Sequence, residues 1–272
     1  MVPSTPSVSE CLQEATRRLP YHEALKVTEK ALDLEPGTLG TYDNVLVGEC
    51  DYSRFVKSLD RRCSGEPIAY IFDTQAFRTL DLYVSPDVLI PRADSETLVE
   101  TVLPWVSEGS EVLDLGTGSG NIGLALAIET GCHVTLVDVF ESTLAIARKN
   151  ALANNISVRS IRSNWFSRIN DAFDVIVSNP PYVSSEDEHL HLGDLRFEPP
   201  QALIAGSDGL SALREIIFNA TGYLKSQGLL AVEHGYDQAD QVQQLFLKND
   251  YHNVRTVKDY AGQPRVTLGQ SA

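Results

Sequence analysis

The sequence predicts an α/β protein whose larger part is an open, mostly parallel β-sheet with helices on both faces. From residue 111 onward, short apolar runs rich in β-branched residues alternate with segments whose apolar residues recur at helical spacing. Strands that are joined through helices pack side by side in parallel, which gives this class of fold. Residues 8–63 show helical periodicity alone, so we expect a small helical unit before the sheet.

The N-terminal unit is expected to contain three helices followed by a hairpin. The first segment with helical spacing of apolar residues begins at Ser9, the second covers Tyr21–Leu34 and the third covers Tyr52–Cys63. Proline and glycine separate them. After this unit the hydrophobic period shifts towards two. Ile68–Phe72 and Phe77–Val84 are therefore expected to form the two strands of the hairpin.

These patterns divide the chain into a helical domain over residues 1–66, a hairpin linker over 67–86 and an α/β domain over 87–272. The α/β domain is expected to open with a helix over Asp94–Val106. The strands expected after it are Val112–Leu115, His133–Val137, Ser157–Ile161, Phe173–Ser178, Gly228–Glu233, Val254–Lys258 and Arg265–Leu268, and the helices are Gly120–Glu129, Glu141–Asn154, Gly209–Leu224 and Tyr236–Lys248.

Composition and charge restrict the classes of function. The net charge of −15 weighs against a large phosphate-binding surface, and so against direct binding of nucleic acid. The start of the chain lacks the basic and apolar regions of a secretory signal, and no run approaches the roughly 18 apolar residues of a membrane span. The cysteines show no ligand spacing and read as reduced thiols of a cytoplasmic protein; they are Cys11, Cys50, Cys63 and Cys132. His189 and His191 lack further ligand-type neighbours, so no metal site is expected.

A glycine-rich loop follows the first strand of the α/β domain. It contains the register Gly118-x-Gly120-x-x-Gly123, and Asp138 ends the next strand, which nearly satisfies the fingerprint of a dinucleotide-binding enzyme. Asp114 argues against that class, because a carboxylate beside the loop would repel a pyrophosphate. The same carboxylate favours S-adenosylmethionine, which carries an ammonium and a sulfonium group but no phosphate.

Other residues near the predicted strand ends suit the same cofactor. The loop glycines let the backbone approach a ligand closely, and Asp138 can accept hydrogen bonds from both ribose hydroxyls. The alternative for Asp138 is an acid that caps a helix. After the third strand, Trp165 can lie against the purine and Asn164 can bind its edge. The alternative for Trp165 is an ordinary place in the core.

The tetrapeptide Asn179-Pro180-Pro181-Tyr182 follows the fourth strand of the predicted sheet. Two prolines end the strand and fix the backbone, so the Asn179 side chain and the Pro180 carbonyl can be held as acceptors beside an aromatic ring. Two acceptors and an aromatic face suit a planar NH2 group, either of an amide or of a nucleobase. The alternative is a stiff loop in which Asn179 caps a turn.

Several motifs resemble those of the release-factor glutamine methyltransferases and occur along the chain in the order given below. The Asn-Pro-Pro-Tyr element is also found in methyltransferases acting on nucleobase amino groups. The Ile-Pro-Arg and Arg-Phe-Glu-Pro elements are much more specific to this family and carry the resemblance. The resemblance runs from about residue 65 to the end and is weak over residues 8–63. The shared segments are Gly65–Tyr70, Phe77, Leu89–Arg92, Glu96–Glu100, Asp114–Gly120, Ser178–Val183, Arg196–Pro199 and Arg265–Gly269.

The resemblance implies a seven-stranded, class I (Rossmann-like) methyltransferase domain behind a helical domain and a hairpin. It implies methyl transfer from S-adenosylmethionine to the side-chain amide of the glutamine in a Gly-Gly-Gln loop of a peptide chain release factor. With the assignments made above, the expected cofactor site comprises Asp114, Gly116, Thr117, Gly118, Ser119, Gly120, Asp138, Asn164, Trp165 and Asn179.

The expected substrate site comprises Asn179 to Tyr182, with Arg92 and Glu198 as further candidates. Asn179, Pro180 and Tyr182 are expected to be catalytic: the first two orient the amide nitrogen and the third covers the amide plane. Arg92 is a candidate either for contacting the acceptor protein or for a salt bridge to Asp94 or Glu96. Glu198 is a candidate either for a substrate-loop contact or for a structural acid.

The chain departs from the family pattern at two positions. Ala93 stands where the family usually has proline after Ile-Pro-Arg, and Asn164 stands where it often has aspartate. Two other functions stay open at this point: an adenine amino-group methyltransferase acting on DNA or RNA, and an inactive cofactor-binding adaptor. The expected partner is a release factor bound by a monomer, with the N-terminal helices as the natural place for docking.

Overall fold

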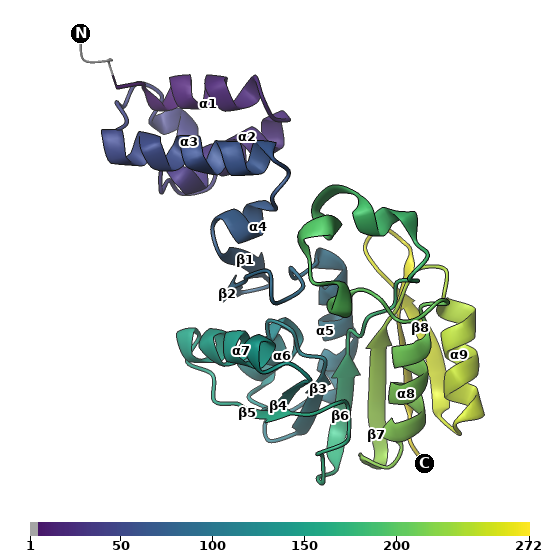
Figure 1. Ribbon diagram of the computed structural model, residues 1–272. Coiled ribbons are helices and arrows are strands. Elements are labelled where there is room, and N and C mark those ends of the chain that lie inside the picture. Colours follow the sequence, from purple (N-terminus) through teal and green to yellow (C-terminus); the bar gives the residue numbers. More distant parts are fainter. Residues whose placement is uncertain (1–4) are drawn as a thin grey trace. The chain divides into compact units, whose positions relative to one another are not determined.

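The computed structural model describes residues 5–272, except for the side chain of His191 (Figure 1). The chain divides into two compact units. The first contains the described residues up to Asp73 together with His191–Phe197, and the second contains Thr74–Leu190 and Glu198–Ala272. Within the described part, no helix is both long enough and apolar enough to cross a membrane.

The first unit is built on the three expected helices, α1 (Val8–Thr16), α2 (Tyr21–Ala31) and α3 (Glu49–Cys63), with a short 3-10 turn η1 (Leu39–Thr41) between the last two. Helix α1 begins with a capping box between Ser7 and Glu10. The apolar faces meet in one core, whose central side chains include Phe55 and Leu59 of α3. The helical periodicity of the sequence therefore predicted these elements correctly.

The first strand expected for the hairpin is wrong. Ile68–Ile71 forms a short helix, α4, which begins directly after Pro67, and the hairpin runs instead over β1 (Thr74–Phe77) and β2 (Leu80–Tyr83). Proline is favoured at the start of a helix, because its fixed φ angle suits the first turn and its missing N–H is not needed there. Ala69, Tyr70 and Ile71 are buried in succession, so they show no period that separates a strand from a helix.

The second unit contains a seven-stranded sheet in the order β5-β4-β3-β6-β7-β9-β8. The strands pair in parallel except at β9, which is antiparallel to both of its neighbours. Each strand predicted for this sheet is present. Their bounds are β3 Glu111–Leu115, β4 His133–Asp138, β5 Arg159–Arg162, β6 Phe173–Ser178, β7 Leu224–Glu233, β8 His252–Lys258 and β9 Pro264–Gln270.

Helices cover both faces of this sheet (Figure 1). One apolar core lies under α5 (Glu96–Val102), α6 (Asn121–Thr130) and α7 (Glu141–Ala153). The other lies under α8 (Ser211–Ala220) and α9 (Ala239–Lys248). The helix expected over Asp94–Val106 is shorter than predicted, because 3-10 turns flank α5 as η2 (Ala93–Ser95) and η3 (Leu103–Trp105), the latter containing Pro104.

The order of the strands reverses direction at β3. The chain proceeds from β3 through β4 to β5 on one side, and then returns to add β6 and β7 on the other. In sheets of this kind the loops that leave the carboxyl ends of the central strands separate there, and ligands bind in the crevice between them. The segment after β6 adds three 3-10 turns that sequence patterns did not predict, η4 (Glu188–His191), η5 (Gly193–Phe197) and η6 (Pro200–Ala202).

Candidate active site

A cavity lies at the carboxyl ends of β3, β4 and β6, within the second unit. It brings together most of the residues that the sequence suggested for a cofactor. Asp114 and Gly120 do not line it. The predicted cofactor residues that do line it are Gly116, Thr117, Gly118, Ser119, Asp138, Asn164, Trp165 and Asn179.

The glycine loop lines one wall of the cavity with backbone. Gly118 has a φ of +56° and open space where a Cβ would lie, so its backbone conformation and not its packing favours glycine. At Gly116 a Cβ would come within 3.3 Å of the Trp165 ring. The side chains of Thr117 and Ser119 are buried, so the loop presents mainly backbone and a ligand can approach its N–H groups closely.

Asp114 lies beneath the loop and is fully buried. Its Oδ2 atom accepts hydrogen bonds from the Thr117 hydroxyl at 2.7 Å and from the Gly123 N–H at 3.0 Å. Its Oδ1 atom has no hydrogen-bond partner among residues 5–272. Burial raises the pKa of Asp114 to about 6, so the group is charged at neutral pH. Its position supports the loop from behind and supplies negative charge below the cavity.

Asp138 lies at the end of β4, and only 9% of it is exposed. Its carboxylate accepts hydrogen bonds from the Gly118 N–H at 3.3 Å and from the Phe140 N–H at 3.0 Å, while burial raises its pKa. The alternative of a helix-capping acid is not supported, because α7 begins after Phe140 without a side-chain cap. Asp138 is instead an acceptor at the cavity wall, fixed to the glycine loop.

Trp165 lines the cavity in a backbone conformation that tryptophan rarely adopts. Its φ angle is +43°, in the left-handed region, and this strain costs on the order of 1–3 kcal/mol. The ring also packs against the apolar core under α8 and α9. It therefore combines both roles considered from the sequence, a wall of the cavity and a partly buried core residue. Asn164 before it is exposed at the cavity edge.

The Asn-Pro-Pro-Tyr segment is divided between the cavity and the protein interior. Asn179 and Pro181 line the cavity, whereas Pro180 and Tyr182 do not. The Asn179 Nδ2 group donates to the Ser95 hydroxyl at 3.0 Å, which fixes the side-chain amide with its donor turned away from solvent. The Tyr182 hydroxyl donates to Glu233 Oε1 at 3.2 Å, so its ring is anchored beneath the segment.

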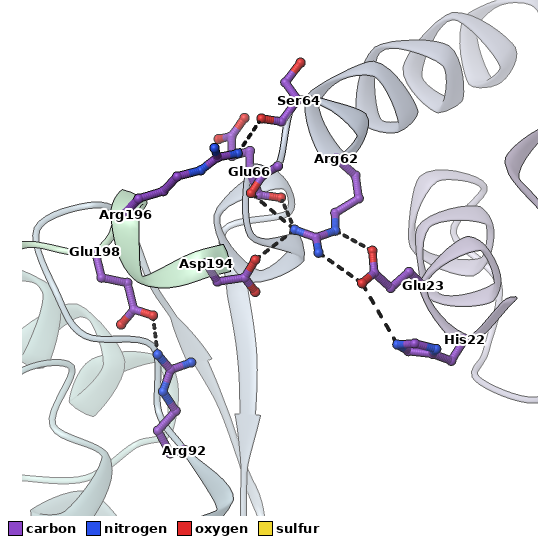
Figure 2. Close-up of polar contacts among 10 residues, drawn as sticks. His22, Glu23, Arg62, Ser64, Glu66, Arg92, Asp194, Arg196 and Glu198 are labelled. Atoms are coloured by element: carbon purple, nitrogen blue, oxygen red, sulfur yellow. Dashed lines mark hydrogen bonds and ion pairs between the residues drawn. The ribbon is translucent and has the colours of Figure 1, made fainter. Parts of the chain in front are cut away.

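Arg92 and Glu198, the two further substrate candidates, bind each other (Figure 2). The Arg92 guanidinium donates to Glu198 Oε1, and the Ile90 N–H donates to Glu198 Oε2 at 3.3 Å. Of the two alternatives considered for Arg92, the structure shows a salt bridge, but its partner is Glu198 and not Asp94 or Glu96. The Glu198 side chain is completely buried, which identifies it as a structural acid that ties the segment after β6 to the loop before η2.

The segment His191–Phe197 belongs to the helical unit through two polar contacts (Figure 2). Asp194 accepts a hydrogen bond at 2.9 Å from Arg62, which also binds Glu23 at 2.6 Å and is 14% exposed. Arg196 donates to the Ser64 carbonyl at 3.0 Å. A stretch of chain that follows the Asn-Pro-Pro-Tyr element is thus part of the N-terminal unit.

His189 lies beside an acid in the segment after β6. The His189 ring lies 2.7 Å from Asp187, and the side chain of His191 lies outside the described residues. Across the described chain, no group of three histidine, cysteine, aspartate or glutamate side chains is arranged to hold a metal ion.

Sequence reasoning missed two buried residues behind the site, Ser95 and Glu233. Glu233 ends β7, and the predicted strand over 228–233 already ended on this carboxylate. Because β6 and β7 are parallel neighbours, Glu233 and Asn179 reach the same edge of the sheet. An acid at the end of an apolar run was therefore an available signal, whereas no pattern in the sequence marks Ser95.

The fold and the cavity together define the class of protein: a Rossmann-like methyltransferase with an Asn-Pro-Pro-Tyr element at the cavity wall. A family model described as "Methyltransferase small domain" matches residues 93–197, and one described as "PrmC N-terminal domain" matches residues 7–72. A solved methyltransferase from Pyrococcus furiosus, 21% identical, has the same fold with a TM-score of 0.56 over 79% of this chain and 97% of its own.

Relatives that are similar in sequence identify the family more specifically than the fold does. A release factor glutamine methyltransferase from Haemophilus influenzae is 43% identical over 91% of this chain and 90% of its own. Another, from Pseudomonas aeruginosa, is 46% identical over 86% of both chains. The chain therefore belongs to the release factor glutamine methyltransferases, and the resemblance predicted from its motifs is confirmed.

Proposed function

We propose that this chain transfers a methyl group from S-adenosylmethionine to the side-chain amide nitrogen of the glutamine in the Gly-Gly-Gln loop of peptide chain release factors. The observation that carries this proposal is the fixed orientation of the Asn179 amide. Because its Nδ2 group is engaged by Ser95, its Oδ1 atom is the group left to accept from a ligand, and no described residue donates to that oxygen. An acceptor held in this way suits an incoming NH2 group.

The cavity fits S-adenosylmethionine better than a phosphate-bearing cofactor. The acids in its lining are Asp87 and Asp138, while Arg92, the cation among the described lining residues, is paired with Glu198. A cationic ligand without phosphate suits such a wall. The glycine loop would hold the cofactor through its backbone, with Asp138 on the ribose hydroxyls and Trp165 and Asn164 on the adenine. When bound, the cofactor supplies an electrophilic methyl group.

The mechanism assigned to the chain's own residues is orientation of a weak nucleophile. An amide lone pair is delocalised, so Asn179 Oδ1 accepts one N–H group and favours the positive charge that develops on nitrogen. The Pro180 carbonyl is proposed to accept the other N–H group; because Pro180 does not line the cavity, this second role rests on the sequence prediction alone. Orientation of this kind lowers a barrier by roughly 7–11 kcal/mol in well-aligned systems. Tyr182 supports the segment from its anchor on Glu233 instead of lining the cavity, which revises the role expected from the sequence.

The helical domain over residues 1–66 is proposed to dock the release factor, with residues 67–86 as the linker and residues 87–272 as the catalytic domain. The active-site chemistry is generic for an NH2 group, so recognition of one protein needs a separate surface. We place the enzyme in the cytoplasm as a monomer that does not bind nucleic acid directly. The net charge of −15 supports this assignment.

The decisive experiment is transfer of label from S-adenosylmethionine to a purified release factor, with its Gly-Gly-Gln glutamine intact or changed to alanine. We expect label on the intact factor and none on the alanine variant. Label on neither factor, together with transfer to an adenine-containing nucleic acid, would replace this proposal with the nucleobase methyltransferase.

A further inference from the structure

A buried carboxyl group lies directly behind the Asn-Pro-Pro-Tyr segment. Glu233 ends β7 next to β6, where Val232 is in register with Ser178, and only 1% of the residue is exposed. Its Oε1 atom accepts from the Tyr182 hydroxyl at 3.2 Å. Its Oε2 atom has no hydrogen-bond partner in the described part of the chain. A carboxylate in such a place is costly, since a buried charge without full pairing destabilises the fold.

A second contact connects this carboxyl group to Asn179. The Ser95 hydroxyl, 1% exposed, accepts the hydrogen bond from Asn179 Nδ2 at 3.0 Å. A hydroxyl that accepts still has one hydrogen to donate. The Ser95 hydroxyl lies close enough to Glu233 to lower the pKa of its carboxyl group. Asn179, Ser95, Glu233 and Tyr182 therefore form one polar network from the cavity wall into the interior.

Other charged groups face Glu233 from the neighbouring elements. Arg265, from β9, lowers the pKa of Glu233, whereas Asp94, from η2, raises it. Arg265 is itself paired with Asp94 at 3.3 Å and with Asp259 at 3.2 Å, so its charge is shared. Burial outweighs these effects and raises the pKa of Glu233 to about 7.

Burial shifts the pKa values of two neighbouring groups away from that of Glu233. The Tyr182 hydroxyl has its pKa raised by burial and by Glu233, and so remains a donor. His234, the next residue in the chain, is neutral: burial lowers its pKa, its Nδ1–H donates to the Gly235 carbonyl at 2.8 Å and its Nε2 accepts from Thr267 at 2.8 Å. Within the network, Glu233 is thus the group whose charge changes near neutral pH.

We propose that Glu233 is a positioning residue whose carboxylate takes the hydroxyl hydrogens of Ser95 and Tyr182, so that Ser95 accepts from Asn179 and directs Asn179 Oδ1 to the substrate amide. This inference rests on the proposed function, in which Asn179 holds the glutamine amide. When Glu233 is protonated, its O–H donates into the network and the Ser95 hydrogen is released towards Asn179. The Asn179 amide then rotates and presents its own NH2 group, a donor, to the NH2 group of the substrate.

The test is the pH dependence of methyl transfer to a release factor by the full-length enzyme. For the unmodified enzyme we expect kcat to fall on the acid side with a midpoint near pH 7, while KM for S-adenosylmethionine changes less than about threefold. Glu233→Gln imitates the protonated acid, because its amide donates where the O–H would. We expect at least a tenfold lower kcat at pH 8 and no acid limb between about pH 6.5 and 8.5.

A matched control and a second variant separate positioning from a general loss of structure. Glu111→Gln makes the same change at the first residue of β3, at the end of that strand away from the cavity. We expect this variant to keep the pH profile of the unmodified enzyme. Ser95→Ala leaves the buried acid in place and removes the acceptor of Asn179, so we expect the same loss of kcat and the same flat profile. Calorimetric binding of S-adenosylmethionine checks that both variants are folded.

The outcomes distinguish this inference from the proposed function. Absence of transfer by the unmodified enzyme would overturn the proposed function, and the positioning role with it. Transfer by the unmodified enzyme, with an acid limb near pH 7 retained in Glu233→Gln or with full kcat in Ser95→Ala, would overturn the positioning role alone.

Discussion

At the scale of single residues, the orientation of one amide group decides what the site can bind. Asn179 has its donor satisfied by Ser95 and its acceptor available at the cavity wall. A side-chain amide turned the other way would present hydrogen atoms to an incoming NH2 group. Binding of an NH2 group therefore depends both on asparagine at position 179 and on the Ser95 hydroxyl that orients its amide.

Asn179→Ala should abolish methyl transfer to the release factor, because the acceptor of the substrate N–H is removed. The affinity for S-adenosylmethionine, measured by calorimetry, should stay within about tenfold, since the glycine loop, Asp138 and Trp165 remain. Asn179→Asp is the informative comparison: it keeps an oxygen but loses the donor to Ser95, and is expected to retain a small part of the activity. Full turnover by the alanine variant would contradict the mechanism.

Arg92→Met should destabilise the second unit, because it removes the cation that pairs with the buried carboxylate of Glu198. The Arg92 side chain is 36% exposed, so the loss is expected to be moderate, on the order of 1–3 kcal/mol in urea unfolding. Combining it with Glu198→Gln should recover part of that loss. If the loss in the double variant equals the sum of the losses in the two single variants, the two side chains do not interact.

At the scale of elements, α6 packs on the sheet at a distance that only glycine allows. A Cβ at Gly123 would lie 2.6 Å from a Leu136 methyl group and 2.9 Å from both Asp114 Oδ2 and a Val134 methyl group. The third glycine of the loop register thus permits close contact between helix and strands, as the fingerprint requires.

Gly123→Ala is expected to lower the free energy of unfolding by about 1–3 kcal/mol through overpacking, and to weaken binding of S-adenosylmethionine by displacing Asp114 from the loop. Thermal unfolding and calorimetry measure the two effects. Gly40→Ala is the control, since it has open space at the Cβ position. A Gly123→Ala variant as stable as that control would show that α6 can move without cost.

Much of the sheet could be predicted, because its strands are separate apolar runs bounded by turn residues. The strand over 173–178 was predicted with its final bounds, and the helices were placed within a few residues. Short 3-10 turns carry no period, so those after β6 were missed. The contacts of Arg92 with Glu198 and of Tyr182 with Glu233 join positions 106 and 51 residues apart, and no local pattern encodes such pairs.

At the scale of the whole molecule, the site is maintained at a cost to stability. Burial raises the pKa of Glu233 to about 7 and that of Asp114 to about 6, compared with ordinary values of 4.5 and 3.8. In the unfolded chain both groups lose their protons at lower pH than in the fold. Their contribution to stability therefore decreases as the pH rises from about 4 to about 7, and is constant above that range.

Glu233→Gln should therefore be more stable than the unmodified enzyme at pH 8, and this advantage should shrink towards pH 5, where the native acid is protonated. We expect the difference in unfolding free energy between the two proteins to change by about 1–3 kcal/mol over that interval. Urea unfolding at pH 5 and pH 8 measures it. A difference that is the same at both pH values would show that Glu233 does not titrate in this range.

The composition of the helical unit has a consequence for synthesis on the ribosome. Its last seven residues, His191–Phe197, are made 118 positions after Asp73. Arg62 and Asp194 are 132 positions apart, so at roughly 5–20 residues per second Asp194 is made about 7–26 s after Arg62, which has Glu23 as its earlier partner. The helices of this unit therefore leave the ribosome before the sheet does, but their contacts with His191–Phe197 form only after β3 to β6 have been made.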